Sequence, residues 1–184
     1  MAVNLTDAQL VAETLRHPHM FREIVQRYEA PLLRYIRRLG LHDEAEDILQ
    51  DSFLKAYRYL GSFDPSLKFS SWMYRIAHNT AMSAHRARQV RPVVERSEES
   101  QKAYDSMAAE LDVSQDLDQE ILKEHLEEAL ARIDKKYQAV IVLRYFEERT
   151  YDEISDILRL PVKTVGTLLH RAKKQLQDKV TPGL

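Results

Sequence analysis

Hydrophobic residues recur along most of this chain at intervals of three and four positions, which is the spacing of one face of an α-helix. A stripe from Phe21 to Leu39 predicts one long helix, in which Pro31 should produce a kink or a break. Asp43 and Glu46 have the spacing of a capping box and predict the start of the next helix. The same periodicity continues to about residue 88, so the first half of the chain should be helical.

The helical pattern fails over residues 89–117, where large apolar residues are few and Glu, Ser, Asp and Gln are frequent. Residues 89–128 carry 12 Asp and Glu against 4 Lys and Arg, a local charge of −8 in a chain whose net charge is −2. Such a segment buries too little apolar surface to offset its chain entropy, so we expect a flexible acidic linker. Because periodicity returns at about residue 118, the sequence predicts an all-α protein with two small helical domains, residues 1–88 and 118–184.

The second domain has the pattern of a helix-turn-helix. Thr150 and Glu153 form a capping box before a short helix, Pro161 lies in a tight turn, and a longer basic helix follows. That last helix is apolar on one face and basic on the other, which suits insertion into the major groove of DNA. A three-helix bundle with a solvated basic face has the same pattern, so both interpretations stay open at this point.

Residues 68–88, KFSSWMYRIAHNTAMSAHRAR, combine aromatic, cationic and amide side chains in one predicted helix. Trp72 and Met73 belong to a stripe that should be buried, whereas Lys68 and Tyr74 should lie largely outside it. Aromatic rings stack on unpaired bases and cations bind phosphates, so such a surface suits single-stranded nucleic acid. Aromatic residues at helical spacing are more often part of a core, and the pattern by itself favours that second interpretation.

Acidic residues gather in residues 42–53, where Asp47 and Asp51 lie one helical turn apart. Carboxylates near the start of a helix are ordinarily stabilised by the helix dipole. No histidine or third acid is placed to complete a metal site with this pair. We therefore expect a solvated helix or a docking surface for a basic partner, and no metal.

Composition excludes several classes of protein. The 184 residues include no cysteine and only 4 glycines, and no apolar run is long enough to span a membrane. There is no Gly-rich phosphate loop, no His-Glu-x-x-His motif and no serine flanked by glycines, and the N-terminal MAVNLTDAQL lacks the layout of a signal peptide. We expect a cytoplasmic protein that is not an enzyme, with no catalytic residue and no cofactor.

Two parts of the chain together resemble a known family. AEDILQDSFLKAYRYLGSFD, followed by KFSSWMYRIAHNTA, is similar to region 2 of the extracytoplasmic-function (ECF) sigma factors of bacterial RNA polymerase. ALARIDKKYQAVIVLRYFEERTYDEISDILRLPVKTVGTLLHRAKKQL is similar to region 4 of the same family. The resemblance implies a protein that binds core RNA polymerase and directs promoter recognition, melting of the minus-ten element and transcription initiation.

The resemblance also assigns residues to three surfaces. Docking on the β′ clamp helices of core polymerase is expected of Asp47, Ile48, Gln50, Asp51 and Phe53. Contact with the melted minus-ten strand is expected of Phe63, Lys68, Trp72, Tyr74, Arg75, His78, Asn79 and Arg86. Recognition of the minus-thirty-five element, by a region 4 that also packs on the β-flap, is expected of Lys163, Thr164, Thr167, His170, Arg171 and Lys174.

The start of the recognition helix departs from the family pattern. Lys163 stands where the family commonly has Gly, Gly166 where it has Lys, and Leu168 where it has Arg. Losing a basic side chain predicts altered or weakened minus-thirty-five recognition, and a glycine inside a helix costs ~1 kcal/mol relative to alanine.

Two further functions are compatible with part of the sequence. A sigma-like decoy that sequesters an anti-sigma factor without reading DNA is the alternative, motivated by the altered recognition helix. A plain helix-turn-helix repressor would leave residues 42–88 without a role. Since family members are commonly held by an anti-sigma factor, we expect such a partner in addition to core polymerase and promoter DNA, and no membrane insertion.

Overall fold

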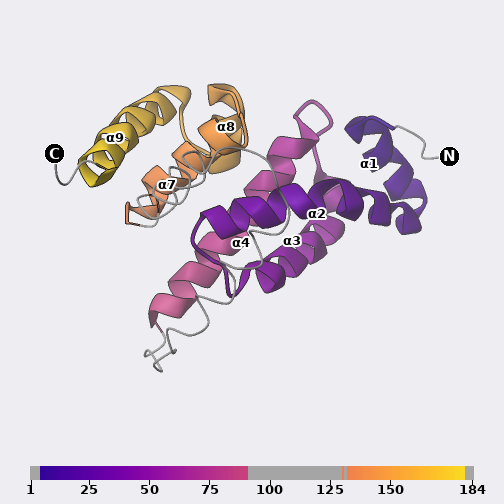
Figure 1. Cartoon of the computed structure of the whole chain (residues 1–184). Coiled ribbons are helices and arrows are strands. Elements are labelled where there is room, and N and C mark those ends of the chain that lie inside the picture. Colours follow the sequence, from indigo (N-terminus) through magenta and orange to yellow (C-terminus); the bar gives the residue numbers. More distant parts are fainter. Residues whose placement is uncertain (1–4, 91–129, 131, 181–184) are drawn as a thin grey trace, which may run out of the picture.

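The computed structural model describes residues 5–90, 130 and 132–180, in which every regular element is a helix (Figure 1). We call residues 5–90 the N-terminal half and residues 130–180 the C-terminal half. The helices of the N-terminal half are α1 (Asp7–Arg16), η1 (Pro18–Met20), α2 (Phe21–Arg38), α3 (Ala45–Tyr59), η2 (Leu60–Ser62) and α4 (Phe69–Val90). Those of the C-terminal half are α7 (Lys135–Ile141), the π-helix η3 (Val142–Phe146), α8 (Tyr151–Leu158) and α9 (Val162–Val180). The all-α prediction is confirmed.

Helices α1 to α4 pack around apolar side chains that the helical spacing brings to one side of each. Thr6 begins α1 with a capping box that it forms with Gln9. Helix α2 buries Ile24, Leu32 and Ile36 completely, and α3 and α4 cover them. This half of the core therefore depends on the periodic stripes that the sequence predicts.

Two expectations about the N-terminal half are corrected. Pro31 does not split α2, which continues from Phe21 to Arg38, because buried side chains on both sides of the proline hold the two parts against the same core. Helix α3 begins after Glu44 without a side-chain cap, and Glu46 pairs instead with Arg37 of α2 at 2.6 Å.

The C-terminal half is a helix-turn-helix preceded by α7. Asp134 caps α7, and Thr150 with Glu153 forms the expected capping box at the start of α8. Helix α8 ends at Arg159, whose backbone adopts the left-handed conformation with φ 54°, and α9 starts at Val162. Residues 118–129, where the helical periodicity is expected to return, and nearly all of the expected linker 89–117 lie outside the described residues.

The two halves lie against each other. Helix α8 packs on α4, and η3 lies beside the end of α2 (Figure 1). Lys135 at the start of α7 donates a hydrogen bond from Nζ to the carbonyl of Leu39 at 2.6 Å, and Gln138 donates from Nε2 to the carbonyl of Arg38 at 2.8 Å. These two side chains satisfy carbonyl groups that the C-terminus of any helix leaves without an intrahelical partner.

Candidate nucleic-acid interface

The residues assigned to polymerase docking separate into a surface set and a core set. Asp47, Gln50 and Asp51 are exposed along one side of α3, whereas Ile48 and Phe53 are only 4% and 8% exposed. Ile48 and Phe53 therefore lie on the core side of α3, because a helix turns these two apolar positions toward α2 and α4.

The exposed side of α3 includes an apolar residue that sequence reasoning missed. Leu54 follows Gln50 and Asp47 at helical spacing and is 57% exposed. Lys55 pairs with Asp51 at 2.7 Å and so partly neutralises this face. Leu54 thus adds an exposed apolar side chain to this otherwise charged and polar side of α3.

An aromatic cluster joins the loop after η2 to the start of α4. The ring centroids of Phe63 and Trp72 are 5.5 Å apart, those of Phe63 and Phe69 are 5.1 Å apart, and those of Phe69 and Trp72 are 5.4 Å apart. Phe63 and Phe69 are buried, while Trp72 is half-buried. Trp72 therefore packs against the core while part of its side chain stays exposed.

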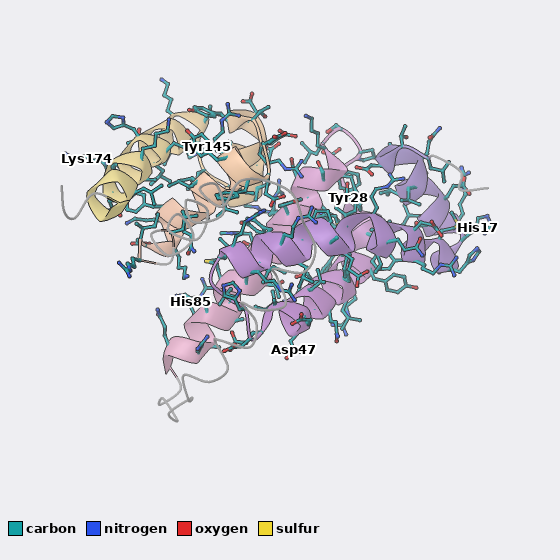
Figure 2. All side chains as sticks on the ribbon, in the orientation of Figure 1. His17, Tyr28, Asp47, His85, Tyr145 and Lys174 are labelled. Atoms are coloured by element: carbon teal, nitrogen blue, oxygen red, sulfur yellow. The ribbon has the colours of Figure 1, made fainter. Side chains whose placement is uncertain are left out.

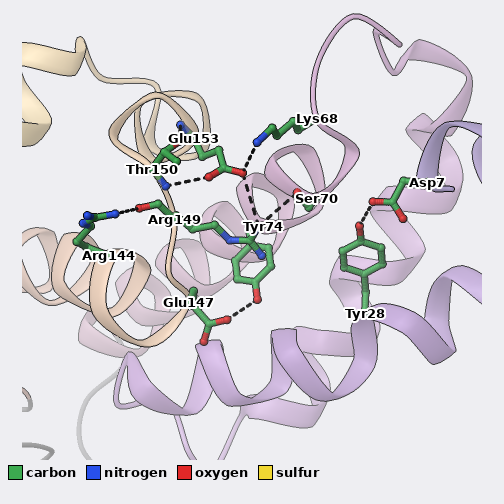
Figure 3. A network of polar contacts seen from close by, with 10 residues as sticks. All are labelled: Asp7, Tyr28, Lys68, Ser70, Tyr74, Arg144, Glu147, Arg149, Thr150 and Glu153. Atoms are coloured by element: carbon green, nitrogen blue, oxygen red, sulfur yellow. Dashed lines mark hydrogen bonds and ion pairs between the residues drawn. The ribbon is translucent and has the colours of Figure 1, made fainter.

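Tyr74 is buried, although it was expected to lie outside the buried stripe of α4. It is 1% exposed, its hydroxyl donates a hydrogen bond to the Glu147 carboxylate, and the Arg149 guanidinium lies 4.4 Å from the ring centroid (Figure 3). Burial raises the pKa of Tyr74, and the hydrogen bond to Glu147 raises it further. Tyr74 is buried through tertiary contacts, because the side chains of Glu147 and Arg149 both come from the C-terminal half.

Lys68 and Arg75 also form polar contacts with the C-terminal half. Lys68 Nζ lies 3.0 Å from Glu153 Oε1, and Arg75 Nε donates to the carbonyl of Asp156 at 2.7 Å. Burial favours the protonated form of Glu153, but hydrogen bonds from the Thr150 backbone and from Lys68 outweigh it and lower its pKa. The carboxylate is therefore held ionised beside the lysine.

The remaining polar residues assigned to the minus-ten strand differ in exposure along α4. His78 is half-buried, with Nδ1 2.9 Å from the Tyr35 hydroxyl, and burial lowers the pKa of His78 to about 4. Asn79 and Arg86 are exposed further along α4. The structure thus brings the set together on α4 and the preceding loop, but leaves its members unequally accessible.

Helix α9 presents its candidate residues to solvent. Val165, Leu169 and Ala172 are buried against the rest of the C-terminal half, and Leu168 packs at the edge of that core. The opposite side of the helix exposes Lys163, Thr167, His170, Arg171 and Lys174, while Thr164 is half-buried. Figure 2 places Lys174 on α9 well away from Asp47 on α3.

Sequence reasoning missed the acidic and basic residues that connect α8 and η3 to α4. Glu147 lies within reach of Arg38 as well as Tyr74, with Arg38 Nη1 3.3 Å from Glu147 Oε1. Arg149 and Glu153 complete this group. Apart from the capping box of Glu153, no local pattern marks these contacts, because Tyr74 lies 73 positions from Glu147 and Lys68 lies 85 positions from Glu153.

Within the described ranges, no three His, Cys, Asp or Glu side chains are grouped as a metal site would require. In the same part of the chain, no helix has the length and apolar character to cross a bilayer.

Comparisons with known proteins agree with the resemblance. Residues 24–91 match the family Sigma-70 region 2, and residues 123–176 match the family Sigma-70, region 4. The chain is 35% identical over 169 residues to the ECF RNA polymerase sigma factor SigW of Bacillus subtilis, covering 86% of this chain and 89% of that protein. It is 31% identical over 188 residues to the ECF RNA polymerase sigma-E factor of Haemophilus influenzae, covering 99% of both.

Two solved structures share the fold. CnrH in complex with the cytosolic domain of CnrY gives a TM-score of 0.69 at 24% identity, covering 94% of this chain and 95% of that one. The sigma factor RpoE of Bartonella quintana, in complex with the anti-sigma factor NepR, gives 0.65 at 20% identity, covering 89% and 98%. With both region matches and the relatives above, the chain belongs to the ECF sigma factors of the sigma-70 family, which are non-enzymatic transcription initiation factors.

Proposed function

We propose that this ECF sigma factor binds core RNA polymerase through α3, holds the melted minus-ten strand on α4 and reads the minus-thirty-five element with α9. The observation that carries the proposal is the division of α9 into a buried apolar side and an exposed side with three cationic side chains and two further polar ones. A recognition helix needs such a surface, with donors for base edges and charges for phosphates.

The docking surface is proposed as Asp47, Gln50, Asp51 and the exposed Leu54 of α3. Ile48 and Phe53 act through the core, where they hold α3 against its neighbours. Charged groups at such a surface steer encounter with a basic partner, and an apolar residue supplies the buried centre of an interface.

The minus-ten surface is proposed as the aromatic cluster around Trp72 together with the cationic and amide side chains of α4. An extruded base loses its stacking energy, which a ring such as Trp72 can restore. Lys68, Arg75 and Arg86 supply positive charge for the backbone, and His78 and Asn79 supply hydrogen-bonding groups.

The domain limits proposed are residues 1–88 for region 2, 89–117 for the linker and 118–184 for region 4. The protein would act in the bacterial cytoplasm, where core polymerase and the chromosome are found. An anti-sigma factor is proposed as a further partner, since the structural neighbour RpoE was solved in complex with the anti-sigma factor NepR.

Run-off transcription from fragmented genomic DNA tests the proposal. Core polymerase is used with and without this protein, transcript starts are sequenced, and a control sigma factor confirms that the polymerase is active. New starts that share a two-part upstream motif are expected. Their absence with folded protein would favour the decoy, which would bind an anti-sigma factor but recruit no polymerase to promoters.

A further inference from the structure

We propose that Asp7 is a positioning residue for Trp72: by accepting the hydrogen bond of the Tyr28 hydroxyl, it fixes an aromatic cluster whose most exposed ring receives an unpaired base. The proposal rests on the proposed function of the minus-ten surface and deepens it. It gives helix α1, which precedes the residues 24–91 that match Sigma-70 region 2, an indirect part in DNA binding.

The Asp7 carboxylate joins the start of α1 to the middle of α2. Its Oδ2 accepts a hydrogen bond from the Tyr28 hydroxyl (Figure 3), and its Oδ1 lies 2.6 Å from Arg27 Nη1. Arg27 Nη2 also donates to the carbonyl of Leu5 at 2.7 Å. Hydrogen bonds to an ionised carboxylate are about twice as strong as neutral ones, so these contacts hold Asp7 at a defined place on α2.

The Tyr28 side chain is held at both of its ends. Tyr28 is 6% exposed, its Cβ belongs to the core side of α2, and its hydroxyl meets Asp7. Burial raises the pKa of Tyr28, and the hydrogen bond to Asp7 raises it further, so the hydroxyl stays protonated and remains a donor. Because a buried hydroxyl without an acceptor is costly, the Asp7 carboxylate selects the orientation of this ring.

The Tyr28 ring is the first of a series of ring contacts that ends at Trp72. Its centroid lies 5.6 Å from that of Phe69, with the two planes at 79°. The Phe69 ring stacks in turn on Trp72 with planes at 28°, and Phe63 contacts both of these rings. Such pairs depend on the mutual orientation of their rings, so in a close-packed cluster a shift of Tyr28 displaces Phe69 and, through it, Trp72.

Trp72 differs from the other three rings in its exposure. Tyr28, Phe63 and Phe69 are buried, whereas Trp72 is half-buried. A base that stacks on Trp72 therefore meets a ring whose position is set from behind by buried neighbours. An ordered ring loses less side-chain entropy on binding than a mobile one, so the Asp7 contact should strengthen DNA binding without touching DNA.

Helix α1 also packs on the elements that carry this cluster. It lies against α2, against η2 and against α4, and so against both elements that flank the loop of Phe63. Leu10 and Val11 are its buried apolar contacts, and a Cβ added at Gly61 of η2 would lie 4.0 Å from Leu15 Cδ2. The contact between Asp7 and Tyr28 therefore belongs to a helix that already supports the loop.

The test uses single substitutions in the full chain and a matched control. Asp7→Ala removes the acceptor, Tyr28→Phe removes only the hydroxyl, and Asp7→Asn keeps an oxygen that can accept the same hydrogen bond. Glu13→Ala is the control, because Glu13 is an acid of the same helix, with a side chain 38% exposed against 32% for Asp7. Circular dichroism and urea unfolding establish that each variant is folded.

The first readout is the fluorescence of Trp72, which is the only tryptophan among the 184 residues. Acrylamide quenching and fluorescence anisotropy measure the exposure and mobility of this ring in the folded protein. We expect Asp7→Ala and Tyr28→Phe to raise the quenching constant and lower the anisotropy, while Asp7→Asn and Glu13→Ala match wild type. A purely structural role of Asp7 would lower the urea midpoint and leave both fluorescence values of the folded protein unchanged.

The second readout is DNA binding by the holoenzyme that each variant forms with core polymerase. The probe is a fluorescent single-stranded DNA with the non-template sequence of the minus-ten segment from a promoter found by run-off transcription. We expect Asp7→Ala and Tyr28→Phe each to weaken binding about fivefold, which corresponds to about 1 kcal/mol. The double variant should bind like Asp7→Ala alone, because both substitutions remove the same hydrogen bond.

Wild-type quenching of Trp72 in Asp7→Ala, equal effects of Asp7→Ala and Glu13→Ala, or additive effects in the double variant would overturn the inference. In each of these cases, promoter-specific starts made with wild-type protein leave the proposed function standing. An absence of such starts would remove the proposed function itself, and the inference with it.

Discussion

Tyr151 at the start of α8 lies beside Gly166 in the recognition helix, so that a Cβ added at Gly166 would stand 3.8 Å from Tyr151 Cε2. This separation is an ordinary van der Waals contact. The glycine that replaces the usual lysine of the family therefore leaves space for a methyl group but adjoins an aromatic ring.

We expect Gly166→Ala to raise the free energy of unfolding by about 1 kcal/mol, because alanine loses less backbone entropy than glycine inside a helix. Urea unfolding followed by circular dichroism measures the change. Gly40→Ala is the contrasting variant, since Gly40 has φ 74° and a Cβ there would lie 2.9 Å from Lys135 Nζ. The second substitution should destabilise the protein, and the same sign for both variants would contradict this account.

Charge reversal at Asp51 should weaken the complex with core polymerase. We expect Asp51→Lys to lower the affinity by about tenfold, since it places a like charge against a basic partner. Loss of the exposed pair with Lys55 should change the free energy of unfolding by less than about 1 kcal/mol. Fluorescence titration with core polymerase measures the affinity, and Glu29→Lys, at an exposed position on α2, is the control. Equal affinities of the two variants would remove Asp51 from the docking surface.

Removing the charge of Lys174 should make DNA binding less sensitive to salt. Each phosphate contact adds about 0.9 to the slope of log K against log salt concentration, so Lys174→Gln should lower that slope by about this amount. The measurement is anisotropy with a double-stranded promoter fragment at several salt concentrations. Lys136→Gln on α7 removes an equally exposed charge away from α9 and should leave the slope unchanged. A drop in both variants would indicate a general charge effect.

His78 should make stability depend on pH. Burial lowers the pKa of His78 from 6.5 to about 4, so the unfolded chain takes up a proton at a higher pH than the folded one. Its contribution is therefore complete above pH 6.5 and is lost as the pH falls toward 4, by as much as about 3 kcal/mol.

The matched variant for this measurement is His78→Asn, whose Oδ1 can accept the hydrogen bond of the Tyr35 hydroxyl. Free energies of unfolding from urea titrations between pH 4 and pH 7.5 should fall more steeply for wild type than for the variant. Parallel curves would show that His78 titrates in the folded protein as it does in the unfolded chain.

The sequence predicts helices well where the determining interactions are local. The capping box of Thr150 with Glu153 joins residues three positions apart, and the buried side of α9 follows from helical spacing alone. The family resemblance assigns an expected function to each helical segment, which the spacing of apolar residues alone cannot do.

The sequence does not predict the burial of a side chain where residues from distant parts of the chain cover it. The residues around Tyr74 in the sequence do not indicate that its side chain is buried. Its hydrogen-bond partner Glu147 lies 73 positions further along the chain. Pro31 is tolerated because packing on both sides outweighs a local preference.

The π-helix η3 makes the number of residues between α7 and α8 as important as their identities. The amide of Glu147 bonds to the carbonyl of Val142, five positions back, and that of Arg149 to the carbonyl of Leu143. Each helical residue turns the chain by about 100°, so removing one residue from this segment would carry Glu147 and Arg149 away from Tyr74 even if every side chain were kept. A change in chain length by one residue here would therefore remove the contacts that Glu147 and Arg149 make with Tyr74 and loosen the packing of the two halves.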